Sequence, residues 1–299
     1  MRQPMSVGAI LDRTFKTYRD KFIEISLFSL LIGGTMALLI SIFEPGSAGL
    51  GAMISIPSLM ESVQGGNLEL LDIIQTNTAG GSPIISLLLN IIDGLFVTPF
   101  VTGGIIFVIL SVFHGHQIEK RSLFSNVQKI YGRLLVTNLA LILFFIGLII
   151  VAAILISILM AVVFAVGMAT LIIVVPVILF AFLFVATFTM FVFPAVVFEE
   201  KRAFRALGRA FQLFRYKIWK SFLLLILVTL MVIVISWIFS LIAAFLPFFI
   251  STILVSAVQG IVTPIPIIAF AYLYLDIRMT KEGYDLELRA LEAREVQEV

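Results

Sequence analysis

The chain has no cysteine and is poor in charged residues. Without cysteine, the protein cannot form disulfides, thiolate metal sites, cysteine nucleophiles or lipid-modified cysteines. Charged residues make up 13% of the 299 residues and apolar residues 61%, whereas a soluble domain has about 25% and about 45–50%. With a mean hydropathy of +1.16, the chain has too little polar surface to cover a water-facing globule. The composition therefore predicts an integral membrane protein.

Long uncharged runs predict the membrane spans. A bilayer core of about 30 Å needs about 20 apolar residues per helix. The runs that meet this length are 25–43, 94–113, 134–198 and 221–275. The last two lack Asp, Glu, Lys, Arg and His and are each long enough for two spans. We expect six spans, with turns near 161–167 and at Leu246 and Pro247.

Basic residues lie on one side only of these spans. All 20 lysines and arginines fall in the segments 1–24, 114–133, 199–220 and 276–299. The opposite side, formed by the loop 44–83 and two short turns, has none. By the positive-inside rule, both termini are then cytoplasmic.

Three of the basic segments carry an amphipathic helical pattern. Apolar residues recur at helical spacing over 7–22, 123–134 and 204–218, and Ser6 is placed to cap the first segment. The candidate lipid or partner contacts on the first and third arms are Arg13, Arg19, Arg205, Arg209 and Arg215. Each arm is predicted to lie in the inner headgroup layer. It either only fixes the topology or also docks anionic lipid or a protein, since each basic residue near an anionic surface contributes about 1 kcal/mol.

An internal repeat relates the first arm to the third. The residues Arg13, Phe15, Tyr18, Arg19 and Lys21 recur 196 residues later as Arg209, Phe211, Phe214, Arg215 and Lys217. The run 97–99 recurs as 262–264, and the outer loop 44–83 accounts for the shorter spacing. The sequence thus predicts an all-α polytopic membrane protein of six transmembrane helices, built as three repeats of a cytoplasmic amphipathic helix plus a transmembrane hairpin.

The repeat units divide a single membrane domain, 1–299. They are 1–113, 114–198 and 199–275, and a cytoplasmic acidic helical tail, 276–299, follows them. The middle unit fits by pattern only. Units of the same orientation would be related by an axis along the membrane normal.

Few residues could carry chemistry. No nucleophile–base pair, phosphate-binding glycine loop or carboxylate pair occurs in the sequence, so we predict no catalytic, cofactor or metal site. His114 and His116 with Glu119 offer at most three metal ligands. We interpret them as a solvated loop, with a metal or a pH-sensitive contact as the alternative.

One acid and three prolines lie near or within the spans. Asp93 would be functional inside the membrane, but counting 20 residues from Asp93 to Phe113 puts it at the outer interface. Without buried ionisable residues near the midplane, an ion-coupled transporter is disfavoured. Pro99 and Pro264 break the second and sixth spans at equivalent positions, with Pro266 close by. Paired breaks can mark a transport site, but we favour ordinary kinks satisfied by neighbouring helices.

Two short runs carry a family resemblance. The last span ends in Tyr-x-Tyr-x-Asp-Ile-Arg over 272–278, followed by Glu-Gly-x-Asp-Leu-Glu over 282–287, and Ile-Leu-Asp-Arg-x-Phe-x-x-Tyr occupies 10–18. In these runs the chain resembles bacterial proteins of the glycerophosphoryl diester phosphodiesterase membrane-domain family. The resemblance implies the bacterial cytoplasmic membrane. It does not imply phosphodiesterase activity, because the catalytic barrel of the namesake proteins has no counterpart in this sequence.

The motif at the end of the last span also has a physical interpretation. Asp276 and Arg278 lie where the helix leaves the inner leaflet, and residues two apart point to different faces. We expect Asp276 to pair with the arm around Arg205 and Arg209. We expect Arg278 to pair with the acidic tail or with a lipid phosphate.

The residues that follow predict how this helix ends. Gly283, next to Glu282, is expected to end it in a left-handed cap, and Asp285 to cap a final helix. That final helix is acidic. It either folds back against the basic arms or docks on a soluble partner.

These features predict a non-catalytic membrane scaffold or lipid-interacting accessory. Its expected partners are the lipid bilayer, anionic lipids and a membrane or cytoplasmic protein, but not nucleic acid. The alternatives are a transporter or lipid carrier with its path between the repeated hairpins and, third, a membrane-embedded lipid enzyme. A wide cavity reaching Pro99 and Pro264 would favour a carrier, whereas a solid core with exposed basic arms would favour a scaffold.

Overall fold

The computed structural model describes residues 5–43, 83–113, 120–166 and 171–283, and every regular element in these segments is a helix. Six helical stretches are long and apolar enough to cross a membrane. They are Phe22–Phe43, Ile84–Phe113, Phe124–Ser157, Pro176–Glu199, Ala203–Ala243 and Phe249–Glu282. The predicted all-α fold with six helices able to span a membrane is therefore confirmed.

The first two spans form a hairpin, and a π-helical turn interrupts each of them. The first span consists of α2 (Phe22–Ser29), η1 (Leu30–Gly34) and α3 (Thr35–Phe43). The second consists of α7 (Pro83–Ile92), η2 (Asp93–Val97) and α8 (Thr98–Phe113). α3 packs against α7, and η1 contacts η2. The residues between them, which form most of the predicted outer loop, lie outside the described part of the chain.

The middle hairpin consists of α9 (Lys120–Val166), α10 (Leu171–Thr189) and α11 (Val192–Glu199). α9 is a single helix of 47 residues, about 70 Å long at 1.5 Å per residue. The predicted separate arm before the third span is therefore wrong. Gly132 is the weakest helix former near the junction, and one glycine lowers helix stability by only about 1 kcal/mol.

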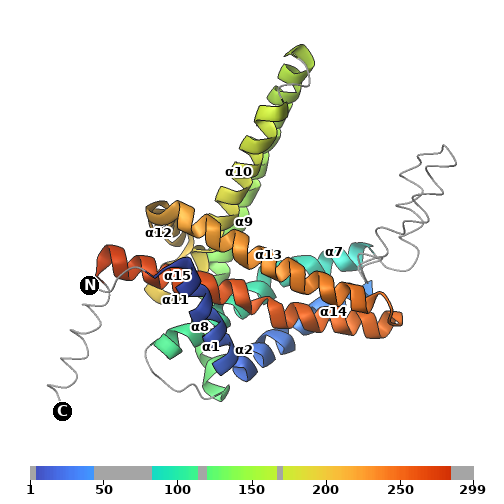
Figure 1. The fold of residues 1–299 in the computed structure, drawn as a ribbon, viewed down its shortest axis with the longest axis vertical. Coiled ribbons are helices and arrows are strands. Elements are labelled where there is room, and N and C mark those ends of the chain that lie inside the picture. Colours follow the sequence, from blue (N-terminus) through green and yellow to red (C-terminus); the bar gives the residue numbers. More distant parts are fainter. Residues whose placement is uncertain (1–4, 44–82, 114–119, 167–170, 284–299) are drawn as a thin grey trace.

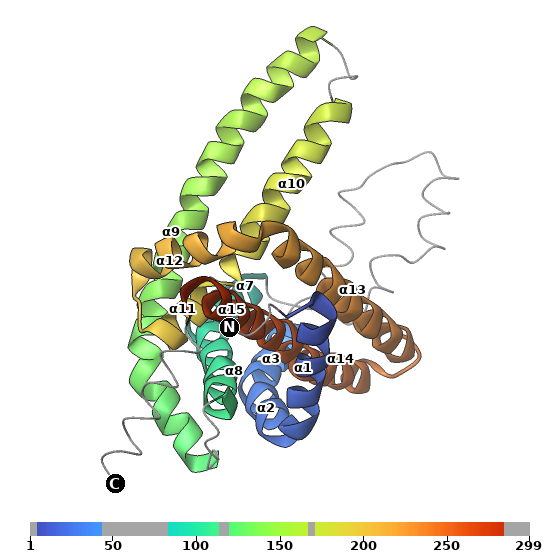
Figure 2. The same ribbon diagram turned by 60° about the vertical axis from the view of Figure 1, so that its left-hand side comes forward.

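The α9–α10 hairpin projects away from the other helices (Figures 1 and 2). Large apolar side chains along it are exposed, among them Ile149, Leu155 and Phe182, and such a surface suits contact with lipid chains. The turn predicted near 161–167 comes a few residues later, because α9 stays helical to Val166 and α10 begins at Leu171. Residues 167–170 lie outside the described part of the chain.

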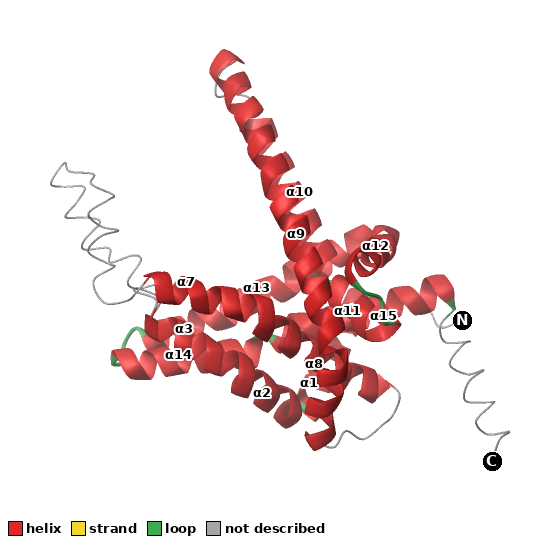
Figure 3. Ribbon diagram, turned by 180° about the vertical axis from the view of Figure 1, so that it is seen from behind, coloured by secondary structure: helices red, strands yellow, loops and turns green. Residues whose placement is uncertain are grey.

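The last hairpin follows α12 (Ala203–Phe214) and the short 3-10 turn η4 (Arg215–Lys217). It consists of α13 (Ile218–Ala243), α14 (Phe248–Val262) and α15 (Pro264–Glu282). The predicted turn at Leu246 and Pro247 is confirmed, with Pro247 preceding α14. α13 and α14 lie side by side (Figures 1 and 3).

The first and third arms end at equivalent lysines, Lys21 and Lys217. The first arm is α1 (Val7–Asp20), which the Ser6 side chain caps by accepting from the Ala9 N–H at 3.2 Å. Lys21, with φ −115° and ψ 26°, separates α1 from α2. Lys217, with φ −138° and ψ 55°, separates the third arm from α13. The helix direction therefore changes between arm and span at these two places, unlike in α9.

The two arms also bury equivalent faces. α1 buries Ile10, Thr14, Thr17 and Tyr18. The residues 196 positions later, Ala206, Ala210, Leu213 and Phe214, are the buried face of α12 together with Leu207. The sequence similarity of the arms thus extends to which of their positions are buried.

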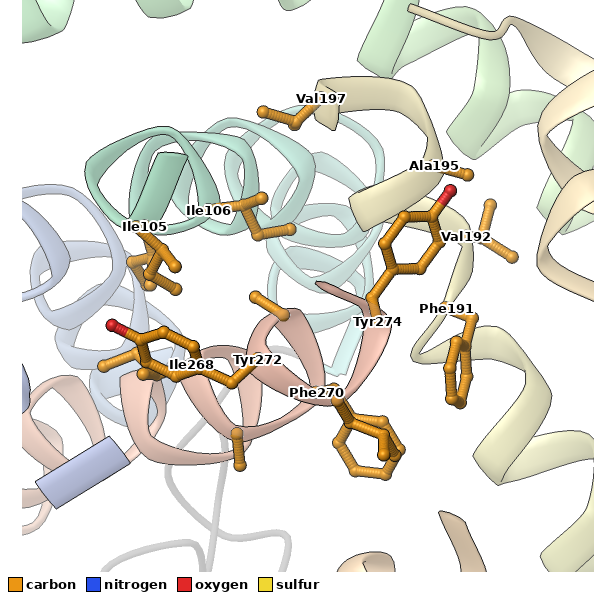
Figure 4. Close-up of a cluster of buried hydrophobic side chains, with 14 of the residues drawn as sticks. Ile105, Ile106, Phe191, Val192, Ala195, Val197, Ile268, Phe270, Tyr272 and Tyr274 are labelled. Atoms are coloured by element: carbon orange, nitrogen blue, oxygen red, sulfur yellow. The ribbon is translucent and has the colours of Figure 1, made fainter. Parts of the chain in front are cut away.

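α8 and α15 form the centre of the protein. Over an 18-residue apolar stretch of each span, 50% of the last span and 44% of the second are buried inside the protein, against 11–22% of the other four. Figure 4 shows where they meet α11: Ile105 and Ile106, Phe191 and Val192, and Tyr272 and Tyr274 converge on one cluster. Two glycines let α8 also pack closely against α9 and α2. A Cβ on Gly103 would lie 2.3 Å from Leu134 Cδ1, and one on Gly104 would lie 2.2 Å from Phe28 Cε1.

Both prolines predicted to break spans lie at the start of a helix. Pro99 is the second residue of α8 and Pro264 the first of α15, and Pro266 follows in the first turn of α15. The break in the first span, at η1, has no proline. Its sequence is Leu-Leu-Ile-Gly-Gly.

Candidate functional site

The basic segments meet at one end of the bundle. Arg133 of α9 pairs with Glu200 at 2.7 Å, and the Ala203 N–H donates to Thr137 Oγ1 at 2.9 Å. The start of α1, the start of α13 and the end of α15 meet beside them, as the contacts of Asp276 show. The shared end that the basic residues predicted is therefore present, and it holds two networks of buried ion pairs.

The first network centres on Asp276, which is 3% exposed. Its carboxylate accepts from the Met5 N–H at 2.8 Å and from Lys220 Nζ at 2.5 Å, with Lys217 Nζ at 3.8 Å. Lys220 also donates to the Met5 carbonyl oxygen. The network ties α15 to α13 and to the segment before α1.

Asp276 pairs with Lys217 and Lys220 and not, as predicted, with the arm around Arg205 and Arg209. The break at Lys217 turns α12 away from α13, so that the lysines at the break, rather than Arg205 or Arg209 along the arm, reach the carboxylate. The prediction that Asp276 finds a basic partner on another element is confirmed.

The second network centres on Glu199, at the end of α11. Its carboxylate accepts from Arg209 Nε at 2.7 Å and from the Tyr274 hydroxyl at 2.6 Å, and Arg278 Nε lies 3.7 Å away. Arg209 also contacts Glu282 at 2.5 Å, and Arg278 Nε lies 3.7 Å from the same carboxylate. The partners of Arg278 are thus Glu199 and Glu282. The expected acidic tail beyond Glu282 lies outside the described residues.

Sequence reasoning missed Glu199. Its position in the sequence could have revealed it, because Glu199 and Glu200 are the first charged residues after the uncharged run 134–198. An acid at the inner end of a span is placed to pair with the arm that follows. The structure shows that pair as Glu199 and Arg209.

Other predicted residues have simple outcomes. Gly283 is the left-handed cap of α15, with φ 65° and ψ 30°, as predicted. Asp285 lies outside the described residues, as do His114, His116 and Glu119.

Of the five candidate contact arginines, three are exposed at the surface. Arg19, Arg205 and Arg215 are exposed, the Arg19 side chain by 82%. Arg13 is half-buried, with its guanidinium 5.2 Å from the centre of the Tyr272 ring. Arg209 is held by two carboxylates, so its role here is to stabilise the bundle.

The first arm carries a hollow of about 470 Å³. The residues that line it are Asp12, Phe15, Lys16, Tyr18, Arg19 and Phe22. Phe15 and Phe22 are exposed beside the two cations. Cationic tips next to exposed aromatic rings are typical of surfaces that lie at a membrane interface.

A second cleft, of about 160 Å³, lies where the three interrupted spans meet. Its lining residues are Ser29, Gly33 and Ala37 of the first span, Asp93, Val97, Thr98, Val101 and Thr102 of the second, and Gln259, Gly260 and Thr263 of the last. Gly33 is near the middle of the span Phe22–Phe43. Asp93, in the same cleft, therefore lies at bilayer depth.

The expectation that Asp93 lies at the outer interface is thus wrong. The count started the second span at Gly94, but α7 continues the helix outward to Pro83. Asp93 accepts from the Thr98 hydroxyl at 3.2 Å. Among the described residues, it has no ion pair with a lysine or arginine.

The π turn that holds Asp93 is braced from α9. Asn138 Nδ2 donates to the Gly94 carbonyl at 2.7 Å and to the Leu95 carbonyl at 3.3 Å. The Tyr131 hydroxyl donates to the Phe96 carbonyl at 3.2 Å. Carbonyls released by a π turn need such partners inside a membrane. Sequence reasoning missed both residues, although Asn138 is the one amide side chain in the uncharged run 134–198.

A family model described as a domain of unknown function (DUF7847) matches residues 26–275. The chain belongs to this family. The match includes the cleft around Asp93, the third arm and, from the Glu199 network, Glu199, Arg209 and Tyr274. It stops one residue short of Asp276 and so excludes Arg278 and Glu282. No curated protein and no solved structure matches the chain. The resemblance to the glycerophosphoryl diester phosphodiesterase membrane domain stays a prediction, carried by its two short runs.

Proposed function

We propose that this family member is a non-catalytic, lipid-interacting scaffold of the bacterial cytoplasmic membrane, with both termini cytoplasmic. The observation that carries the proposal is the hollow on α1, which places Lys16 and Arg19 beside Phe15 and Phe22. Anionic headgroups would contact the cations, and the rings would enter the boundary of the acyl chains.

The arms are held firmly enough to present such a surface. The Thr17 hydroxyl is hydrogen-bonded to the Tyr272 hydroxyl at 2.6 Å, and the Tyr18 hydroxyl donates to the Ile261 carbonyl at 2.6 Å. The third arm is tied down through Arg209 and Glu199. Both arms thus turn a bonded face to the spans and leave Arg19 or Arg215 exposed.

The repeat belongs to the same proposal. The arms end in lysines at equivalent positions, and each buried residue of α1 has a buried counterpart in α12. Both features support a relation between the first and third units. The middle unit, with its continuous α9, is the more divergent member. Two related arms would give the scaffold two similar lipid-binding surfaces.

A lipid carrier, the second candidate, has less support. Side chains fill the centre beside Pro99 and Pro264, where α8 packs on α15. The cleft that touches Thr98 and Thr263 has a volume of about 160 Å³, which is below the roughly 300–1,000 Å³ of ordinary ligand pockets. It is too small for a diacyl lipid.

The test is retention of anionic lipid. The quadruple variant Lys16→Gln, Arg19→Gln, Arg205→Gln and Arg215→Gln should lose anionic lipid during mild detergent purification at low salt, because each charge contributes about 1 kcal/mol. The difference should shrink at high salt, where screening weakens the native interaction. Lipid per protein is counted by mass spectrometry.

The matched control is Asp12→Asn, which lies in the same hollow but makes the arm more basic. It should retain at least as much anionic lipid as the wild type. Equal lipid retention by the wild type and a well-folded quadruple variant would leave the arms as topology signals only.

A further inference from the structure

We infer that the cleft where the three interrupted spans meet binds a small monovalent cation beside Asp93. This site goes beyond the proposed lipid-binding role of the arms and lies on a different part of the protein. The inference starts from the position of Asp93 at bilayer depth, in a cleft shared by three broken helices.

A carboxylate at this depth needs a partner. Charged side chains in the hydrocarbon region are costly and pair with other groups or line functional paths. The hydrogen bond to Asp93 in the described structure comes from the Thr98 hydroxyl, at 3.2 Å. A neutral donor of this kind orients the carboxylate but leaves its charge unbalanced.

The other polar groups of the cleft supply oxygen. Hydroxyls come from Ser29, Thr102 and Thr263, and Gln259 adds an amide. Hard cations select carboxylate, carbonyl and hydroxyl oxygens, whereas softer metals select imidazole or thiolate. None of the residues that line the cleft is histidine, cysteine or methionine.

The charge and size of the cleft fit a monovalent ion. Asp93 is the one titratable residue among those lining the cleft, so a single positive charge neutralises it. The volume of about 160 Å³ holds about five waters at about 30 Å³ each, or an ion with part of its hydration shell. A divalent ion would bring an excess charge into the membrane.

The backbone around the cleft is fixed in this form. η2 is braced by Asn138 and Tyr131 from outside the cleft. On the opposite wall, Gly260 lies against η1, where an added Cβ would be 3.2 Å from Leu30 Cα and 3.5 Å from Gly34 Cα. Interrupted spans whose breaks meet near mid-membrane are a known arrangement for binding cations such as Na⁺.

The experiment uses the full chain in detergent, with Na⁺ as the probe. Thermal unfolding is measured as NaCl replaces choline chloride at constant ionic strength. We expect the melting temperature of the wild type to rise with Na⁺ and to saturate, because a ligand that binds only the folded state stabilises it. Asp93→Asn should abolish this Na⁺ dependence, while the control Asp12→Asn should keep it.

A second variant keeps the carboxylate and so covers a folding failure of Asp93→Asn. Thr98→Val removes the hydroxyl that orients Asp93 and should raise the Na⁺ concentration at half-effect by about tenfold, as for lost supporting partners of metal ligands. An unchanged half-effect concentration in Thr98→Val, or equal Na⁺ dependence in wild type and Asp93→Asn, would overturn the proposal. So would a wild type that ignores Na⁺ and responds only to acidification, since Asp93 would then hold a proton.

Discussion

Lys220 Nζ lies 2.5 Å from Asp276 Oδ2, and the same ammonium also donates to the carbonyl of Met5. One lysine at the start of α13 therefore joins the end of the last span to the segment before the first arm. Met5, whose N–H donates to Asp276, is 271 residues away from it in the sequence. The contact closes the basic end of the bundle.

Replacing Asp276 with Asn should lower stability. Removing one member of a buried pair costs about 3–5 kcal/mol. We expect about 2 kcal/mol here, since the two lysines keep some contact with water and Asn can still accept from Met5. The measurement is the melting temperature in detergent. The double variant Asp276→Asn with Lys220→Met should recover part of the loss, whereas a double variant no more stable than Asp276→Asn would contradict the pairing.

Adjacent acids offer a matched pair of variants at the end of α11. Glu199→Gln leaves Arg209 and Arg278 without their shared carboxylate and should cost about 2–3 kcal/mol. Glu200→Gln removes the charge of a side chain that is 75% exposed and should change stability by no more than about 1 kcal/mol. Chemical or thermal unfolding of the two variants in one detergent makes the comparison. Similar losses of stability in both variants would show that the Glu199 network stabilises the protein no more than the exposed pair of Glu200 does.

The sequence predicted those features that the bilayer itself imposes. Span number follows from apolar length, and the shared basic end follows from the distribution of lysine and arginine. The left-handed cap at Gly283 follows from local chemistry. These features need no knowledge of how distant helices pack.

Features that depend on packing were missed or misjudged. The patterns at 7–22 and 123–134 look alike, yet α1 separates from its span at Lys21 while α9 runs on. Asp93 was placed too far outward because the apolar residues of α7 were not counted in the span. Asp276 pairs with Lys217 and Lys220, near the break between α12 and α13, rather than with the arginines of α12. The direction of α12 decides which of these charges reach the carboxylate. Each outcome depends on contacts with other helices that a local pattern does not contain.

Two glycines make the close packing of α8 testable. Gly104→Ala should destabilise the protein by about 1–3 kcal/mol, because the new methyl group would meet the Phe28 ring. Gly147→Ala is the control, since nothing lies within 4 Å of a Cβ there, and it should leave stability unchanged or slightly raised. The measurement is thermal unfolding in detergent. Equal effects of the two substitutions would argue against the close contact of α8 and α2.

The absence of cysteine makes the proposed orientation easy to test. Phe245 is 89% exposed in the turn before α14, and Tyr216 is 50% exposed in η4, at the basic end. In intact cells, a membrane-impermeant thiol reagent should label Phe245→Cys and leave Tyr216→Cys unlabelled until the cells are opened. The reverse pattern would invert the topology and place the basic arms outside.

Two asparagine variants can test whether the hydrogen bonds from Asn138 to η2 stabilise the protein. Asn138→Ala leaves the Gly94 and Leu95 carbonyls without their side-chain donor. Hydrogen bonds between membrane helices average about 0.6 kcal/mol, so the loss of this brace should cost about 1 kcal/mol.

Asn90→Ala is the matched control for the brace. Asn90 Nδ2 donates to the Ser86 carbonyl on its own helix, α7, so its removal breaks a hydrogen bond within one helix rather than between two. Asn138→Ala should also weaken the Na⁺ dependence of the melting temperature, because the brace holds the backbone around Asp93, while Asn90→Ala should preserve it. If Asn138→Ala lowered stability but left the Na⁺ response unchanged, the brace would serve packing alone, and the shape of the cleft would not depend on α9.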